Sequence, residues 1–406
     1  MTSVLIAGAS IAGPHLAHWL DRYGFDTTLV ERAPEFRDGG QNIDVRGAAR
    51  EALRRSGLEQ AVLDATTGEQ GTRFLAEDGS TLAEFPVTGD ETSGATAEAE
   101  VLRGDLARIL LDAVEGRTEV VLGDRITAMR DDGRGVDVEF EHGTPRRFDL
   151  VVAADGVRSS TRQLVFGDEA RIRPLGLEMT YLTIPRTASD DDWWRWCTLQ
   201  GGSANLRPDR HGTTRALISE TVERGDEHPA GERRGADTRS ADEQRAPLRE
   251  RFGEAGWETP RILAALDDAP DLYFESIGQV RAPRWSSGRI ALTGDAAWCA
   301  SPVSGVGTSL ALVGTFVLAG ELAAHDDPRQ AFAAYEQRLR PYVEKGQDLP
   351  PGTPQLANPT SRLGLAALRA GLRAAGTGPG RALAGRLLAP PADGFELPDW
   401  SHLERG

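Results

Sequence analysis

Residues 4–13 read Val-Leu-Ile-Ala-Gly-Ala-Ser-Ile-Ala-Gly, an apolar run that enters a glycine-containing turn. The run predicts a β-strand over residues 3–8, and the apolar positions after Pro14 predict a helix over residues 13–23. Residues 26–31 predict a second strand, so the three segments form a βαβ unit with parallel strands. Such a turn places several backbone N–H groups at the start of a helix, where they suit the pyrophosphate of a dinucleotide.

Individual positions refine this interpretation. Gly8 allows the turn and Gly13 lets the helix pack closely on the strand, whereas Ser10 stands where the motif has its middle glycine. Glu31 ends the second strand, where a carboxylate can accept hydrogen bonds from a ribose diol; the alternative is a solvated strand end paired with Arg32. The residues expected to contact the nucleotide are Gly8, Ser10, Ile11, Ala12, Gly13, Glu31 and Arg32.

A second segment, far downstream, looks like the other half of one nucleotide site. Residues 289–292, Arg-Ile-Ala-Leu, are expected to be a strand that enters Thr293-Gly294-Asp295-Ala296-Ala297, and an apolar helix is expected over residues 307–323. Asp295 at a strand end can accept hydrogen bonds from a sugar-alcohol chain, and the helix N-terminus stabilises the anionic edge of a reduced flavin. Alternatively, Asp295 caps a helix and the glycines are turn residues. The predicted contacts are Gly294, Asp295, Pro302, Gly305, Val306, Gly307 and Thr308.

The later glycine segment resembles the second flavin motif of single-component (class A) FAD-dependent aromatic monooxygenases. This family includes para-hydroxybenzoate hydroxylase and the tetracycline-inactivating enzymes. Residues 155–162, Asp-Gly-Val-Arg-Ser-Ser-Thr-Arg, resemble the Asp-Gly motif of the family, which touches both the flavin and the nicotinamide cofactor. By the same resemblance, Asp155, Gly156, Arg46 and Arg103 are expected near the flavin.

The sequence departs from the family pattern at three positions. Trp298 follows the Gly-Asp-Ala-Ala block where the family often has His. Ser309 stands in place of a common Asn, and Gly314 in place of a later Asp.

The resemblance implies an enzyme whose chemistry is centred on FAD. NADPH or NADH reduces the flavin, O2 adds to form a flavin C4a-hydroperoxide, and the distal oxygen hydroxylates an aromatic or polyketide-like small molecule. No protein nucleophile is needed, so no catalytic residue is assigned, with Arg46 as the one possible candidate. Two alternatives stay open: Baeyer–Villiger oxygenation on the same scaffold, and a non-redox cyclase that keeps FAD as structure.

A tryptophan-rich region supplies the candidate substrate contacts. Met179, Tyr181, Trp194 and Trp196 could face a flat hydrophobic ligand. They could equally form the core of the second domain, because aromatic clusters fill cores as readily as pockets.

The pattern of elements predicts an α/β fold: a Rossmann-like FAD-binding domain, an interleaved substrate domain of mostly antiparallel sheet, and C-terminal helices. A helix is expected over residues 48–64, a hairpin over 72–88, and solvated loops over 222–246 and 373–393. The FAD-binding domain is assigned residues 1–71, 101–170 and 277–345, the substrate domain residues 72–100 and 171–276, and the C-terminal tail residues 346–406.

Composition narrows the class of partner. The 406 residues carry a formal net charge of −16, which argues against nucleic acid and anionic lipid as partners. No stretch of about 20 apolar residues and no secretion signal is visible, so we expect a cytoplasmic protein without a membrane span. Only Cys197 and Cys299 occur, without metal-like spacing, so no metal is expected. A monomer or weak homodimer that meets a small molecule and O2 is predicted.

Overall fold

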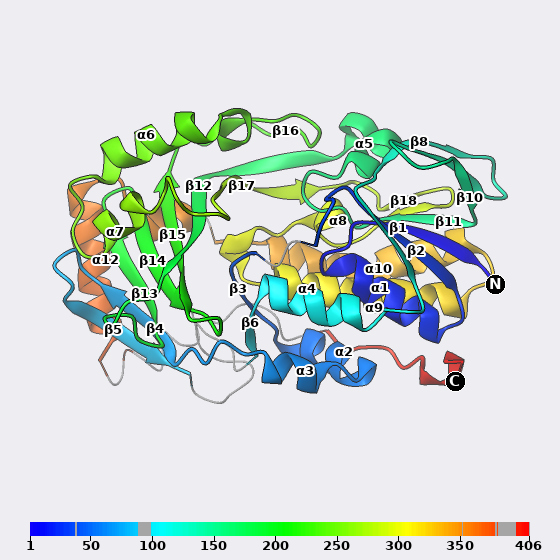
Figure 1. Ribbon diagram of the computed structural model, residues 1–406, viewed down its shortest axis with the longest axis horizontal. Coiled ribbons are helices and arrows are strands. Elements are labelled where there is room, and N and C mark those ends of the chain that lie inside the picture. Colours follow the sequence, from blue (N-terminus) through cyan, green and yellow to red (C-terminus); the bar gives the residue numbers. More distant parts are fainter. Residues whose placement is uncertain (37–38, 88–98, 351, 378–379, 381–394, 406) are drawn as a thin grey trace.

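The computed structural model describes residues 1–406 except 37–38, 88–98, 351, 378–379, 381–394 and 406. Its two largest sheets have six and eight strands and lie at opposite ends of the molecule (Figure 1). The six-stranded sheet is mainly parallel and flanked by helices, whereas the other is mainly antiparallel. This confirms the predicted α/β class with a Rossmann-like part and a second, mostly antiparallel part.

The six-stranded sheet contains the predicted βαβ unit. Strand β1 pairs in parallel with both β2 and β11, and β11 pairs in parallel with β19. The strand order is β18-β19-β11-β1-β2-β7, with bounds Ser286–Ser287, Ile290–Leu292, Leu150–Ala153, Ser3–Ala7, Asp26–Glu31 and Glu119–Leu122. Segments distant in the sequence therefore end side by side at one edge of the sheet.

Both faces of this sheet are buried, which explains why its central strands are almost wholly apolar. Val4 and Ile6 belong to a core cluster to which three helices contribute among other elements, and Leu5 and Val151 belong to a cluster formed with a small antiparallel sheet. The helices are α1 (Ala12–Arg22), α9 (Gly307–Ala324) and α10 (Pro328–Gln347). The small sheet contains β8 (Ile126–Asp131), β9 (Val136–Phe140) and β10 (Arg146–Phe148).

Helix α9 is long and apolar enough to cross a membrane by length and composition alone. However, 78% of this stretch is buried inside the protein, where it packs against α1, α2 (Gly47–Ser56) and α10. The fold therefore accounts for its hydrophobicity as that of a core helix.

The eight-stranded sheet is assembled from two separate parts of the chain. The hairpin predicted over residues 72–88 is present as β4 (Gly71–Leu75) and β5 (Thr81–Pro86), and β4 pairs in parallel with β13. The other strands are β12 (Arg171–Pro185), β13 (Trp194–Leu199), β14 (Gly202–Pro208), β15 (Thr213–Thr221), β16 (His228–Pro229) and β17 (Tyr273–Arg281).

The two faces of this sheet differ in character. One face carries a buried apolar cluster with helices α6 (Ala241–Phe252) and α7 (Thr259–Ala264), which lie over it in Figure 1. Leu182, Cys197 and Ile218 belong to this cluster. Side chains alternate along a strand, so Tyr181 and Trp196 lie on the opposite face. None of Met179, Tyr181, Trp194 and Trp196 is a member of that core cluster.

The remaining elements correct two predictions and part of a third. The helix expected over residues 48–64 is two helices, α2 and α3 (Glu59–Asp64), because Gly57 adopts a left-handed conformation with φ of 80° and ends α2. The loop expected over residues 222–246 contains β16 and the start of α6, which Ser240 caps through a capping box with Glu243. The solvated loop expected over residues 373–393 begins as helix to Ala375, and most of it lies outside the described residues.

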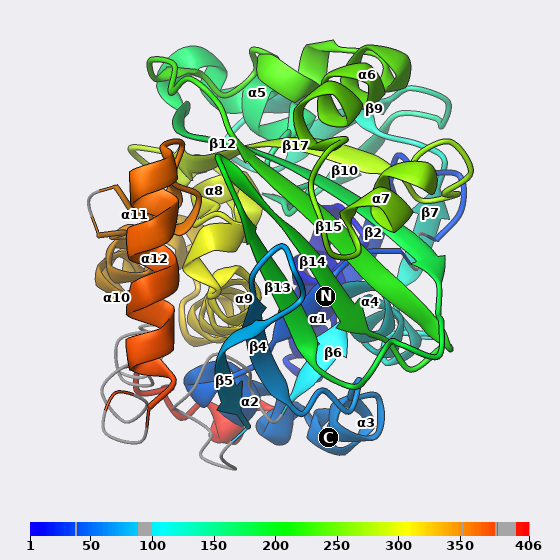
Figure 2. The same cartoon turned by 90° about the vertical axis from the view of Figure 1, so that its left-hand side faces the viewer.

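The other bounds complete the description. They are β3 (Asn42–Asp44), β6 (Glu100–Leu102), α4 (Arg103–Asp112), α5 (Ser160–Phe166), α8 (Asp295–Trp298), α11 (Thr353–Ala357) and α12 (Arg362–Ala375). In Figure 2, α12 runs beside the eight-stranded sheet, where it contacts β5 and β13.

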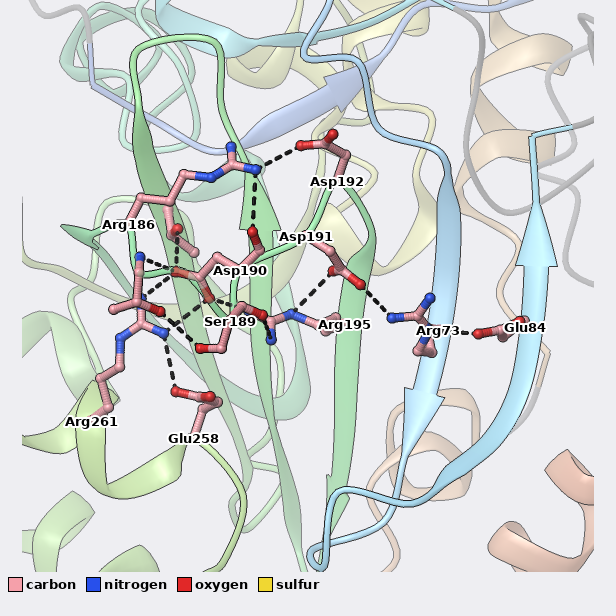
Figure 3. A network of polar contacts seen from close by, with 12 residues as sticks. Arg73, Glu84, Arg186, Ser189, Asp190, Asp191, Asp192, Arg195, Glu258 and Arg261 are labelled. Carbon is pink, nitrogen blue, oxygen red and sulfur yellow. Dashed lines mark hydrogen bonds and ion pairs between the residues drawn. The ribbon is translucent and has the colours of Figure 1, made fainter.

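An ion-pair network fixes the loop between β12 and β13 (Figure 3). Asp190, whose side chain is 2% exposed, pairs with Arg195 on β13 and with Arg261 on α7, the latter at 2.5 Å. Asp191 pairs with Arg73 on β4 at 2.5 Å. These pairs connect two strands of the second sheet and helix α7 at the point where the tryptophan-bearing strand begins.

Candidate functional site

The N-terminal turn leaves no room for side chains at its two key glycines. Gly8 has a φ of 106°, and a Cβ there would lie 2.5 Å from the Ala154 carbonyl oxygen. A Cβ at Gly13 would lie only 1.9 Å from the carbonyl oxygen of Gly8. The start of α1 is thereby held directly against the end of β1, which is the geometry of a phosphate-binding turn. Ser10 and Ile11 on this turn are partly exposed, and Ala12 is buried.

Glu31 lies at the edge of the same turn. Its Oε2 accepts a hydrogen bond from the Ala9 N–H at 3.1 Å, and its Oε1 accepts one from the Ala33 N–H at 2.9 Å. Arg32 is exposed and forms no ion pair with Glu31 within the part of the chain that the structure describes. The carboxylate is therefore positioned by the backbone of the turn and not by the adjacent arginine.

The two halves of the predicted nucleotide site are in contact. A Cβ at Gly294, which has a φ of 58°, would lie 3.0 Å from the Cβ of Ala12. The helices that follow the two turns are joined by a buried hydrogen bond between His15 Nδ1 and Thr315 Oγ1, 2.6 Å long. Sheet order explains this contact, because β19 and β1 both pair with β11 and end at the same edge.

Asp295 begins α8, whose N-terminus has no side-chain cap, so a helix-capping role for Asp295 has no support here. Solvent reaches the residue, as it reaches Pro302 and Gly305, yet burial by the surrounding protein raises the pKa of its carboxyl above the usual value. The Asp295 carboxyl is therefore surrounded by protein atoms and yet open to solvent.

The segment after Asp295 leads to the start of α9. Gly305 adopts a left-handed conformation with φ of 67°, and α9 begins two residues later at Gly307. A Cβ at Gly307 would meet nothing within 4 Å. Val306 is buried and Thr308 is partly exposed. An 18-residue helix thus points its N-terminus into open space, where its dipole favours negative charge.

The Asp-Gly motif forms the turn between β11 and α5. The Asp155 carboxylate accepts hydrogen bonds from the Ser159 hydroxyl and from the Thr161 N–H, the latter at 3.1 Å. Gly156 has a φ of 82°, and a Cβ there would meet nothing within 4 Å. Asp155 therefore shapes the turn, and Gly156 leaves space beside it.

Arg162, to which the sequence analysis gave no role, joins this motif to the second glycine segment. It is 1% exposed, and it donates hydrogen bonds to the Ala296 carbonyl at 2.8 Å and to the Val157 carbonyl at 2.7 Å. Burial lowers the pKa of its guanidinium to about 10. The position of Arg162 at the end of the Asp-Gly motif was the one sequence signal for a role in the site. The sequence could not show that its partner is the carbonyl of Ala296, which is distant in the chain.

The structure places the two predicted arginines in different surroundings. Arg103 is exposed, donates from Nη1 to the Ser10 hydroxyl at 3.3 Å, and lies so close to Gly40 that a Cβ there would be 2.8 Å from its Nε. Arg46 is 2% exposed and pairs with Asp44 at 3.0 Å. Arg103 thus lies at the rim of the nucleotide turn, whereas Arg46 contributes a buried charge.

One contact explains two departures from the family pattern. Trp298 is buried, and its ring packs on Trp285 with centroids 4.4 Å apart. A Cβ at Gly314 would lie 2.7 Å from Cζ2 of Trp298. The large indole therefore requires the glycine opposite it, so the two replacements form one packing arrangement. The structure gives no reason for Ser309, which is buried in α9.

The predicted substrate contacts form two aromatic groups on one face of the eight-stranded sheet. Tyr181 donates from its hydroxyl to the Met179 sulfur at 2.9 Å and stacks on Tyr273, with ring centroids 6.2 Å apart. Trp194 and Trp196 have centroids 5.1 Å apart, and Trp194 Nε1 donates to the Asn205 oxygen at 3.1 Å.

Sequence reasoning missed Tyr273 and Glu275 on β17. The strand register pairs Tyr273 with Tyr181 and Glu275 with Met179, so both lie on the same face as the predicted contacts. Desolvation, reinforced by the negative charge of Asp295, raises the pKa of Glu275 to about 7, although Arg158 and Arg103 oppose the shift. The only sequence signal was that Tyr273 and Glu275 are two residues apart, so that they share a face if the segment is a strand.

Comparison with known proteins agrees with this geometry. A family model described as an FAD binding domain matches residues 1–348. An uncharacterized protein of Mycobacterium tuberculosis (strain ATCC 25618 / H37Rv) is 39% identical over 87% of this chain and 95% of its own. A flavin-dependent monooxygenase from an unknown prokaryotic organism is 37% identical over 85% of this chain and 87% of its own. The crystal structure of tetracycline destructase Tet(55) matches with a TM-score of 0.79 and 31% identity, over 98% of both chains.

The residues fit FAD on structural grounds. Cβ atoms at Gly8, Gly13 and Gly294 would collide with or crowd their surroundings, while Gly156 and Gly307 border free space. The turn between Gly8 and Gly13 offers backbone N–H groups without side chains in the way. Asp295 and the N-terminus of α9 lie on the other segment. This pair of segments suits an extended dinucleotide. Together with the match over residues 1–348, this shows that the chain belongs to the FAD-dependent monooxygenase family and is an FAD-dependent oxidoreductase.

Proposed function

We propose that this flavoenzyme uses NADPH or NADH and O2 to hydroxylate a planar small molecule of aromatic or polyketide type. When bound, FAD supplies the redox chemistry, since it accepts a hydride from the nicotinamide and activates O2. The residues of this chain hold the cofactor, orient the substrate and exclude water from the reaction.

In this proposal, three discontinuous segments hold the cofactor: residues 1–71, 101–170 and 277–345. The N-terminal turn takes the pyrophosphate, Glu31 the ribose, and Asp295 the ribityl chain, while the start of α9 faces the flavin ring. Residues 72–100 and 171–276 bind the substrate, and residues 346–406 form a C-terminal tail. A monomeric or weakly dimeric cytoplasmic protein stays our prediction.

The observation that carries the substrate class is the aromatic face of the second sheet. Met179 and Tyr181 lie on the face opposite the core of that sheet, and Tyr273 beside them is 49% exposed. An exposed aromatic ring next to polar groups suits a flat ligand with a few oxygen substituents. The similarity to a tetracycline destructase supports a polycyclic ligand of this kind.

A flavin titration tests the proposal. The purified protein should be yellow, or become so with FAD, and NADPH or NADH should bleach it without O2. With O2, tetracycline should stimulate NAD(P)H oxidation and yield a product with one added oxygen. A colourless protein that cannot be loaded with FAD would overturn the proposal. A ring-expanded ester would favour Baeyer–Villiger oxygenation, and bound FAD that no nicotinamide reduces would favour the non-redox cyclase.

Asp295→Ala should weaken FAD retention about 10-fold to 100-fold while leaving the fold intact. The carboxylate is enclosed, and a lost hydrogen bond to a charged group costs about 1.5–3 kcal/mol. Equilibrium dialysis of FAD measures the effect, and the exposed Asp268→Ala is the matched control. Equal FAD affinity in Asp295→Ala and the wild type would show that the ribityl contact is misassigned.

A further inference from the structure

Glu275 lies where the cofactor motifs and the substrate face meet. It is on β17 opposite Met179, and its neighbours on that face are the stacked pair Tyr181 and Tyr273. Strand β17 also packs against the segment after α8, since the Val280 N–H donates to the Cys299 carbonyl at 3.1 Å. One end of the strand is thus anchored to the flavin motif, and the other presents Glu275 beside an exposed aromatic ring.

The Glu275 carboxylate has no hydrogen bond or ion pair to any of the residues described in the structure, although it is partly buried. A partly buried carboxylate usually accepts a hydrogen bond, because removing it from water without such a partner costs free energy. Charged or titratable groups from each surrounding element act on it through space. They are Asp295 on α8, Cys299 after it, Arg158 after β11, Arg103 on α4, Tyr273 on β17 and Tyr181 on β12.

We propose that Glu275 binds a hydroxyl group of a planar ring that lies against Tyr273, and that it accepts the proton of this hydroxyl. The O–H bond breaks, the proton moves to a carboxylate oxygen, and the electron pair stays on the ring oxygen. The resulting phenolate or enolate is more nucleophilic at its ring carbons, which favours attack on an electrophilic oxygen. The inference rests on the proposed function and narrows its substrates to phenols and enols.

The proposal predicts a pH-dependent preference for hydroxylated rings. Only the ionised carboxylate accepts a hydroxyl proton, and desolvation together with Asp295 places the pKa of Glu275 at about 7. The ionised fraction therefore rises from about a tenth to about nine-tenths between pH 6 and pH 8. A neutral phenol should bind more tightly at the higher pH, whereas a ring without a hydroxyl should not.

The experiment uses FAD-loaded protein without reductant and two matched probes, 2-naphthol and 2-methoxynaphthalene. Equilibrium dialysis measures the affinity of each at pH 6 and pH 8. We expect 2-naphthol to bind the wild type about fivefold to tenfold more tightly at pH 8. Glu275→Gln should remove this gain, and 2-methoxynaphthalene should show no gain with either protein. The exposed Glu139→Gln, remote on β9, should behave as the wild type.

A gain that persists in Glu275→Gln, or one that 2-methoxynaphthalene shares, would overturn the inference, as would the absence of saturable 2-naphthol binding. If the Glu275→Gln protein does not retain FAD, the experiment uses Glu275→Asp instead. This variant should bind 2-naphthol more weakly than the wild type at pH 8, and unchanged binding would overturn the inference. Failure of the proposed function would be separate, because the wild type would then lack FAD or NAD(P)H oxidation. If only the inference about Glu275 is wrong, the wild type still binds FAD and still oxidises NAD(P)H.

Discussion

Gly13→Ala should yield a protein that holds less than about a tenth of the FAD bound by the wild type. The added methyl would lie 1.9 Å from the Gly8 carbonyl oxygen, a distance that no rearrangement of side chains can relieve because the clash is with backbone. Helix α1 would have to move away from β1, and the N–H groups at its start would leave their positions around the pyrophosphate. Overpacking of this kind also costs about 1–3 kcal/mol of folding free energy.

Gly371→Ala is the matched control, because Gly371 also lies within a helix. A Cβ there would meet nothing within 4 Å, so the substitution in α12 should stabilise the protein by up to about 1 kcal/mol through helix propensity. The ratio of flavin to protein absorbance after incubation with FAD measures retention, and urea denaturation measures stability. Normal FAD binding by Gly13→Ala would show that the turn at Gly8 does not form the phosphate cradle.

The cofactor half could be predicted because its signals are local. The apolar run before Gly8, the glycines and the apolar helix each report the conformation of their own segment, and parallel strand order brings their ends together. The contact between Ala12 and Gly294 follows from that order. The helix break at Gly57 was missed, because one glycine inside a helical pattern is often tolerated.

The substrate half depends on pairings that the sequence does not record. Alternation along β12 and β17 shows which residues share a face of their own strand, but not which strands are neighbours. The register of Glu275 opposite Met179 also includes an irregularity between Pro174 and Glu178, which no local pattern predicts. The coupling of Trp298 with Gly314 is likewise a tertiary contact, visible in sequence only as two separate departures.

Asp190→Asn should lower the free energy of unfolding of the protein by about 3 kcal/mol at pH 7. The carboxylate pairs with Arg195 and Arg261 and accepts a hydrogen bond from the Thr187 N–H at 2.9 Å. Removing the charge of Asp190 leaves the buried Arg195 without its main counter-ion. An uncompensated buried charge is strongly destabilising. Arg195 is beside Trp194 on β13, so the substitution should also disturb the tryptophan pair and change its fluorescence.

The pH dependence of this effect has a definite sign. Hydrogen bonds from Arg261 and from the backbone outweigh desolvation and hold the pKa of Asp190 below its usual value. The wild type has the full contribution above the unfolded aspartate pKa of about 4, and it loses that contribution as the pH falls towards the lower folded value. The difference between Asp190→Asn and the wild type in urea denaturation should therefore shrink below pH 4. Asp192→Asn, which breaks an exposed pair with Arg186, should cost less than about 1 kcal/mol. Equal losses in the two variants would mean that the Asp190 network does not hold β13 in place.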